Sequence, residues 1–289
     1  MSLPVVDAPP MPAFEASPPK PRRRAPSPWL ILLGLILGSV VLAPWIAAYD
    51  PLAQLADGLS PLGAPLPPSA HHWLGTDELG RDVLSRVLHG GRLSLLIAAA
   101  ATSLAGILGV GCGMVAGYAA GRVDNLLMRA TEIVMAFPLL LLAIALASVL
   151  PPGPISVVIT LGVVGWTSLA RVVRGTVLQV REQEFVEASR AVGAGHIRIL
   201  LQHIWPNVRP LALTLLALKL ADMLLLEAAL GFLGLGVPPP TPTWGSLVGE
   251  ARAYFYHAPW LGLPAGAAIF LTVLAVNMLA ERATAASRR

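Results

Sequence analysis

The stretch EASRAVGAGHIRILLQHIWP, residues 187–206, decides how this chain is interpreted. It is polar, basic and helix-forming, yet hydrophobic sequence long enough to cross a membrane flanks it on both sides. A carboxylate, a pair of small residues, two glycines and a closing proline stand at fixed offsets within it. This pattern predicts a docking element, and therefore a membrane protein with a soluble partner.

The composition also indicates a membrane protein. Hydrophobic residues make up 55% of the 289 residues and charged residues only 12%, whereas roughly a quarter of the residues are charged in soluble domains. Residues 29–49, 133–150 and 258–280 contain no charge, and a helix crosses the hydrocarbon core with roughly 20 apolar residues. The basic residues lie between the apolar runs, which argues against nucleic-acid binding. The single cysteine, Cys112, excludes an intrachain disulfide.

The apolar runs predict an all-α polytopic membrane protein with six transmembrane helices. They are expected at residues 28–48, 93–118, 129–150, 155–171, 207–232 and 259–280. This arrangement puts both termini on one face together with 15 of the lysine and arginine residues, and leaves four on the opposite face. Because cytoplasmic loops are enriched in these residues, we expect both termini to be cytoplasmic.

These spans divide the chain into a membrane core, tails and outer segments. The expected parts are a cytoplasmic Pro/Arg-rich tail (1–27), the first transmembrane helix (28–48), an extracytoplasmic segment (49–92), a core transmembrane domain (93–280) and a cytoplasmic tail (281–289). The core contains the docking loop (180–206) and an outer loop (233–258). The first apolar run is longer than a signal-peptide core of roughly 7–15 residues, so we expect it to remain as a membrane helix.

Small residues recur every four positions along the second expected span. They are Ala101, Ala105, Gly109, Gly113, Gly117 and Gly121. At this spacing two helix backbones can approach closely in lipid. The ridge predicts close helix packing, either within the chain or against a second subunit.

The sequence contains no enzymatic motif that we recognise. Neither Lys20 nor Lys219 stands in a Gly-Lys-Ser/Thr phosphate loop, and no HExxH or GxSxG motif occurs. The adjacent His71 and His72 are interpreted as loop residues rather than metal ligands. We therefore predict that the chain is not an enzyme and binds no metal or cofactor. If it moves a solute uphill, the energy comes from a partner or from an ion gradient.

The docking loop is expected to form two short helices joined by a glycine elbow. Glu187 favours a helix N-terminus through the macrodipole, and Ala188 and Ser189 keep that helix slim enough to enter a groove. Gly193 can adopt a positive φ, and Pro206 suits the first turn of the next span. The alternative is an amphipathic loop on the lipid headgroups, with Ile197, Leu200, Leu201 and Ile204 on its apolar face.

Three charged residues, Lys219, Asp222 and Glu227, lie in the fifth expected span. Lys219 and Asp222 are three residues apart and can pair on one helix face, which lowers the cost of burying them. Charges inside a membrane usually face a bundle interior or a water-filled cavity. The trio is a candidate translocation path for a cationic or zwitterionic solute, and internal bracing is the alternative.

The outer segment contains a compact polar cluster that includes Asp77, Arg81 and Asp82. Aspartate caps short helices well, and Arg81 can pair with a neighbouring carboxylate. We interpret the cluster as a structural turn. The alternative is that it braces an outer gate or contacts a binding protein.

Three blocks of the sequence resemble one family of transport proteins. EASRAVGAGHIRILLQHIWPNV (187–208) resembles the EAA loop of ABC-importer permeases, with Ser189 in the second alanine position and Trp205 where leucine is usual. HHWLGTDELGRDVLSRVLHGGRLSL (71–95) and LLLEAALGFLGLGVPPPTPTWGSLVGEAR (224–252) are similar to the second permease subunit of dipeptide, oligopeptide and nickel importers. The tail AERATAASRR departs from the family pattern.

The resemblance implies a type I ABC-importer permease fold in the bacterial inner membrane. This chain would form half of the translocation pathway for peptides, nickel or related small solutes. The implied partners are a homologous second permease subunit, two cytoplasmic ABC ATPases that hydrolyse the ATP, and an extracytoplasmic solute-binding protein. Nucleic acid is not among them.

The resemblance also implies roles for particular residues. The ATPase-coupling loop would contain Glu187, Ala188, Ser189, Gly193 and Pro206. Glu227 matches a glutamate that is common in the family before the GFLGLG run. Two other functions stay open: an ion-coupled secondary transporter that uses the intramembrane charges, and a membrane-embedded hydrolase, for which no nucleophile–base pair can be named.

Overall fold

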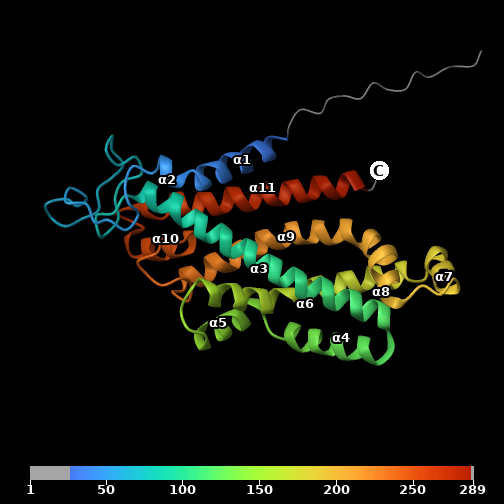
Figure 1. Ribbon diagram of the computed structural model, residues 1–289. Coiled ribbons are helices and arrows are strands. Elements are labelled where there is room, and N and C mark those ends of the chain that lie inside the picture. The colour runs from blue at the N-terminus through green and yellow to red at the C-terminus, as the bar shows by residue number, and fades with distance from the viewer. Residues whose placement is uncertain (1–26, 288–289) are drawn as a thin grey trace, which may run out of the picture.

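A computed structural model describes residues 27–287, and its long helices lie roughly side by side so that the protein has two distinct ends (Figure 1). Its main helices are α1 (Pro28–Val41), α2 (Ala43–Ile46), α3 (Val83–Ala119), α4 (Gly121–Met135), α5 (Leu139–Val149), α6 (Pro154–Val180), α7 (Glu184–Ala191), α8 (His196–Ile199), α9 (Trp205–Phe232), α10 (Trp244–Glu250) and α11 (Leu263–Ser287). A π-helical turn spans Leu200–Ile204, and 3-10 turns span Ala251–Tyr254 and Pro259–Leu261. Within these residues no strand is found, which confirms the predicted all-helical class.

Three helices of the described chain, α3, α6 and α11, are long and apolar enough to cross a membrane. A fourth span results if α4 and α5 are counted as one bent helix. Helix α1 is shorter, with 14 residues. Helix α9 has 28 residues but carries Lys219, Asp222 and Glu227 along its length.

The helix ends differ from the expected span boundaries. Helix α3 begins at Val83, so the last part of the expected outer segment 49–92 is helical. Asp82 caps this helix by accepting a 2.8 Å hydrogen bond from the Ser85 N–H. Helix α6 continues to Val180 and α11 to Ser287, beyond the expected limits of 171 and 280. The length of an apolar run indicates only the part of a helix that lies in the membrane, whereas the helix itself continues until a cap or a proline ends it.

Prolines break two of the expected spans. The expected span 129–150 is interrupted between α4 and α5, and the two helices meet at an angle of 87°. Pro138 begins the second of them and has no N–H to continue the hydrogen bonds of the first. The expected span 28–48 is likewise divided into α1 and α2, with Pro44 in the first turn of α2.

The ridge of small residues on α3 packs against α6 of the same chain. A Cβ atom added at Gly109 would lie 2.5 Å from the Trp166 carbonyl oxygen, and one at Gly113 would lie 2.6 Å from that of Ala170. Only glycine permits this approach of the two backbones. The intrachain interpretation of the ridge is therefore confirmed for these positions.

Helix α10 packs against α3, α9 and α11, although it belongs to the expected outer loop 233–258. Trp244 is buried, and its Nε1 donates a 2.9 Å hydrogen bond to the Val87 carbonyl oxygen. A Cβ at Gly245 would lie 2.6 Å from Cα of Ala228 on α9. The loop thus returns into the bundle as a short buried helix.

The two ends of the bundle carry different elements. Segment 49–82 and α10 lie at one end, and α7 and α8 lie at the other, where α11 also finishes (Figure 1). The Arg282 Nη1 donates a 2.7 Å hydrogen bond to Ser27 Oγ, which joins the end of α11 to the start of α1. The first and last parts of the described chain therefore meet at the α7–α8 end.

Candidate functional site

The docking loop forms the two short helices that the sequence predicts. Helix α7 ends before Gly193, which has a φ of +86° and donates a hydrogen bond to the Arg190 carbonyl oxygen at 2.9 Å. Helix α8 follows after Gly195, whose φ of −68° is ordinary. The elbow therefore depends on Gly193, and Pro206 lies in the first turn of α9 as expected.

The base of the docking loop is buried and its tip is exposed. Val186, Ile199 and Ile204 pack with Val173 and Val177 of α6. Val192 and Ile197 at the tip are 90% and 75% exposed. The four residues expected to share one apolar face do not do so, because the π-helical turn shifts their register: Ile204 is buried, whereas Ile197 and Leu201 are exposed.

Polar contacts hold the parts of the docking loop together. Ser189 Oγ donates to the Phe185 carbonyl oxygen at 2.8 Å and lies 3.2 Å from Nε2 of His203 in the π-helical turn. The Tyr118 hydroxyl of α3 lies 2.9 Å from Nδ1 of His196 in α8. Of the expected coupling residues, Ala188, Ser189 and Gly193 line a surface hollow of about 370 Å³. Glu187 is exposed beside them.

On α9, the structure brings Lys219 and Asp222 together and separates Glu227 from them. The Lys219 Nζ lies 3.2 Å from the Asp222 Oδ2, and Lys219 also lines a cavity. Glu227 is fully buried, and neither of its carboxyl oxygens accepts a hydrogen bond within the described residues. The hydroxyls of Ser94 on α3 and Thr243 before α10 lie near it. Glu227 therefore faces the packing between α9, α3 and α10.

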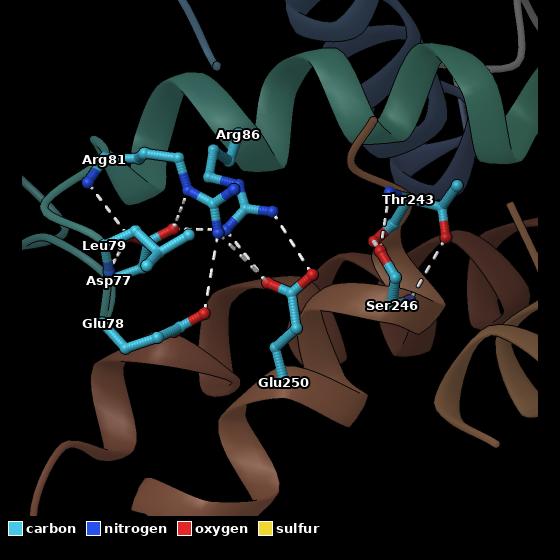
Figure 2. A network of polar contacts seen from close by, with 8 residues as sticks. All are labelled: Asp77, Glu78, Leu79, Arg81, Arg86, Thr243, Ser246 and Glu250. Carbon is cyan, nitrogen blue, oxygen red and sulfur yellow. Dashed lines mark hydrogen bonds and ion pairs between the residues drawn. The ribbon is translucent and has the colours of Figure 1, made fainter. Parts of the chain in front are cut away.

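The outer cluster is built around Asp77 (Figure 2). Its Oδ2 accepts hydrogen bonds from Arg81 Nε at 2.7 Å and from Arg86 Nη1. Its Oδ1 accepts hydrogen bonds from the backbone N–H groups of Leu79 and Arg81, both at 2.9 Å. Arg86 Nη1 also lies 2.9 Å from Glu250 Oε2 at the end of α10. The cluster thus joins three separate elements of one end of the bundle.

The structure divides the residues predicted for this cluster. Asp77 and Arg81 belong to the network, whereas Asp82 caps α3 and lies 3.1 Å from Nδ1 of His72. Sequence reasoning missed Arg86 and Glu250. Arg86 could have been noticed as a basic residue one turn into a helix capped by Asp82, but its pairing with Glu250, 164 residues away, has no local signal.

The carboxylates of Asp77, Glu78 and Glu250 lie close enough together to suggest a metal site. Arg81 and Arg86 already supply positive charge to the same space. Burial raises the pKa of Glu78, and the nearby Asp77 and Glu250 charges add to that effect. The two guanidinium groups thus offset much of the negative charge of the three carboxylates without any other cation.

Comparisons with known proteins agree with this architecture. Residues 109–289 match the family described as "Binding-protein-dependent transport system inner membrane component". The di/tripeptide transport system permease protein DppC of Pseudomonas aeruginosa is 40% identical over 258 residues, which cover 87% of this chain and 84% of that protein. The oligopeptide transport system permease protein OppC of Bacillus subtilis is 38% identical over 253 residues, covering 87% and 81%.

Two further matches bear on function class and fold. The nickel transport system permease protein NikC of Escherichia coli K12 is 39% identical over 252 residues, covering 87% of this chain and 89% of that protein. A crystal structure of an amino acid ABC transporter with histidines superposes with a TM-score of 0.52 and 15% identity, covering 68% of this chain and 91% of that one. This structural match supports a shared fold.

Long apolar helices and an exposed helical loop, together with these matches, define a membrane transport component. The chain belongs to the family of binding-protein-dependent transport system inner membrane components, as a permease of the peptide and nickel ABC-importer type. This confirms the resemblance drawn from the three sequence blocks. Because the relatives are permease components, the prediction that the chain is not an enzyme is also confirmed.

Proposed function

We propose that this chain forms half of the translocation pathway of an ATP-driven importer in the bacterial inner membrane. The solute would be a peptide, nickel or a related small solute. A homologous permease subunit would supply the other half, and two cytoplasmic ATPases would bind the docking loops and hydrolyse the ATP. An extracytoplasmic solute-binding protein would deliver the solute to the opposite end of the bundle.

The observation that carries this proposal is the contrast between the tip and the base of the docking loop. Its tip exposes Val192 and Ile197, and α7 lies beyond the ends of the long helices (Figure 1). Exposed apolar side chains with a neighbouring hollow are typical of a protein-docking surface. Its base is packed into the bundle, so a partner that moves the tip would also move the helices.

The connections of the docking loop support such a lever. The π-helical turn Leu200–Ile204 continues directly into α9. At the other end of the loop, Arg181 Nη1 donates a 3.0 Å hydrogen bond to the Gly117 carbonyl oxygen of α3. Movement of α7 and α8 would therefore reach α3, α6 and α9 together. ATP-driven motion of the ATPases would bias these helices between inward-open and outward-open states.

The proposed topology has six crossings, formed by α1–α2, α3, α4–α5, α6, α9 and α11. Both termini and the docking loop would be cytoplasmic. The contact between Ser27 and Arg282 supports an even number of crossings, because it joins the start of α1 to the end of α11. The excess of lysine and arginine on that face supports its cytoplasmic orientation.

Crosslinking from the docking loop tests this proposal. Val192→Cys, on a Cys112→Ala background, should crosslink to a co-purifying ATPase, and the yield should change when nucleotide is added. Tyr256→Cys is the matched control, because Tyr256 is also exposed but lies before α11, at the opposite end of the bundle. Absence of any ATPase, together with uptake driven by a proton gradient in ATP-depleted vesicles, would instead establish a secondary transporter.

A further inference from the structure

A cavity of about 310 Å³ lies in the membrane core where α4 and α5 meet at their sharp bend. Apolar side chains of α4, α5 and α6 form most of its lining, and its polar lining consists of Thr167, Ser168 and Lys219. Lys219 is the only charged lining residue. A chargeable group beside an apolar cavity in a permease marks a site where a solute can be held.

The Lys219 ammonium is available to a second anion. Its side chain is 12% exposed, whereas the side chain of its partner Asp222 is 57% exposed. The contact between them is therefore an ion pair that is open on its Asp222 side. An ammonium carries more N–H donors than one carboxylate contact uses. A solute carboxylate can thus share or displace Asp222 at Lys219 without unfolding any element.

The bend between α4 and α5 supplies acceptors at the same cavity. Among the described residues, no N–H group donates to the carbonyl oxygens of Met135, Ala136 or Phe137. Met135 and Phe137 line the cavity. Carbonyl groups left unpaired at membrane depth are tolerated where they face a water-filled space or a ligand. The carbonyl groups of the two lining residues, Met135 and Phe137, are therefore the acceptors that this bend offers to the N–H groups of a peptide.

We infer that this cavity is a solute-binding site in which Lys219 holds a carboxylate, so that it selects carboxylate-bearing, peptide-like solutes over a bare metal cation. Relatives named for peptide transport and for nickel transport resemble the chain equally well, so the resemblance does not choose between them. Lys219 favours a peptide over nickel, because an ammonium attracts a carboxylate and repels a divalent cation. The inference rests on the proposed importer function.

The test uses the importer purified with its co-purifying subunits and reconstituted in proteoliposomes, supplied with ATP and with the solute-binding protein that the proposed function requires. The probes are a mixture of dipeptides, the same mixture as C-terminal amides, and Ni²⁺ alone. The wild type should accumulate the acids at least about tenfold faster than the amides, because the amides lack the carboxylate that Lys219 would bind. Lys219→Met should bring that ratio close to one, and Lys219→Arg should preserve it.

Arg252→Met is the matched control, because it also removes a basic side chain but lies in the outer loop, where Arg252 packs over the Phe232 ring. It should leave the ratio unchanged. Any one of four results would overturn the inference. They are equal wild-type rates for acids and amides, failure to accumulate either, uptake of Ni²⁺ in preference to the acids, and an unchanged ratio in Lys219→Met. If nucleotide-dependent crosslinking from the docking loop persists in that case, the proposed importer function survives.

A binding measurement covers the case in which Lys219→Met does not assemble. Ser168 lines the cavity and is exposed, so Ser168→Cys on a Cys112→Ala background offers a thiol at the site. The dipeptide acids should slow its alkylation severalfold, and the amides should not. Equal effects of the two mixtures, or no effect of either, would contradict a carboxylate site.

Discussion

Arg86, in the first turns of α3, places its Nη1 2.9 Å from the Oε2 of Glu250, the last residue of α10. The same guanidinium pairs with Asp77 (Figure 2). The side chain of Arg86 is 1% exposed. Removing one partner of a buried ion pair leaves an uncompensated charge. This contact therefore links the position of α10 to the start of α3.

Arg86→Met should destabilise the protein by about 3–5 kcal/mol, because it removes the more deeply buried of the two guanidinium groups that pair with Asp77 and Glu250 and leaves Arg81 alone with both. Thermal unfolding of the detergent-purified protein measures the loss. Arg92→Met is the control: Arg92 is an exposed arginine on the same helix, and its removal should change stability by no more than about 0.5 kcal/mol. Equal losses in the two variants would show that the network does not stabilise this end.

Trp244→Phe tests the anchoring of α10 to α3. The substitution keeps an aromatic ring but leaves the buried carbonyl of Val87 without the Nε1 donor, which should cost about 1–3 kcal/mol. Trp244→Ala should cost more, about 3–5 kcal/mol, because it also leaves a cavity. The same unfolding measurement decides the order, and a Phe variant as unstable as the Ala variant would assign the anchoring to packing alone.

Gly193→Ala should impair coupling more than it impairs folding. An alanine at the +86° φ of Gly193 would cost about 1–2 kcal/mol, so the elbow between α7 and α8 would change shape. Transport and ATPase crosslinking should fall together. Gly195→Ala is a close control, because Gly195 has a φ of −68° and an added Cβ meets nothing within 4 Å. Loss of coupling in both variants would contradict a role for the elbow.

The buried carboxyl of Glu78 predicts a pH dependence of stability. Burial raises its pKa above the ordinary value of 4.5, so folding favours the protonated form. Its stabilising contribution is therefore largest at low pH and is lost as the pH rises through the raised pKa. Glu78→Gln, which stays neutral, should raise the melting temperature over wild type at pH 8 and lose that advantage toward pH 4.5.

The features that the sequence predicts correctly depend on local signals. Gly193 and Pro206 mark the elbow and the start of α9, because a glycine that can adopt positive φ and a proline without an N–H act within a few residues. The three family blocks likewise identify the class of protein. Both kinds of signal lie in contiguous sequence.

Two kinds of feature were not predicted. Some depend on contacts between residues that are distant in the sequence, and others on helix ends that do not coincide with the ends of apolar runs. Arg86 meets Glu250 only after α10 has folded back into the bundle, and a helix of seven residues leaves no membrane-span pattern. The extension of α6 to Val180 was not predicted, because a charged residue such as Arg171 ends an apolar run without ending a helix. Pro138 did carry a signal for the broken span, although its apolar neighbours conceal it.

The π-helical turn at Leu200–Ile204 has a geometric consequence for the docking loop. A turn with one residue more than an α-helix rotates everything before it by about 100° about the axis of α9. The direction in which α7 points is thus set by residue number as well as by residue type. If the five residues of this turn became α-helical without a deletion, α7 would swing to a different side of the axis of α9, whereas deletion of one residue would leave its direction nearly unchanged.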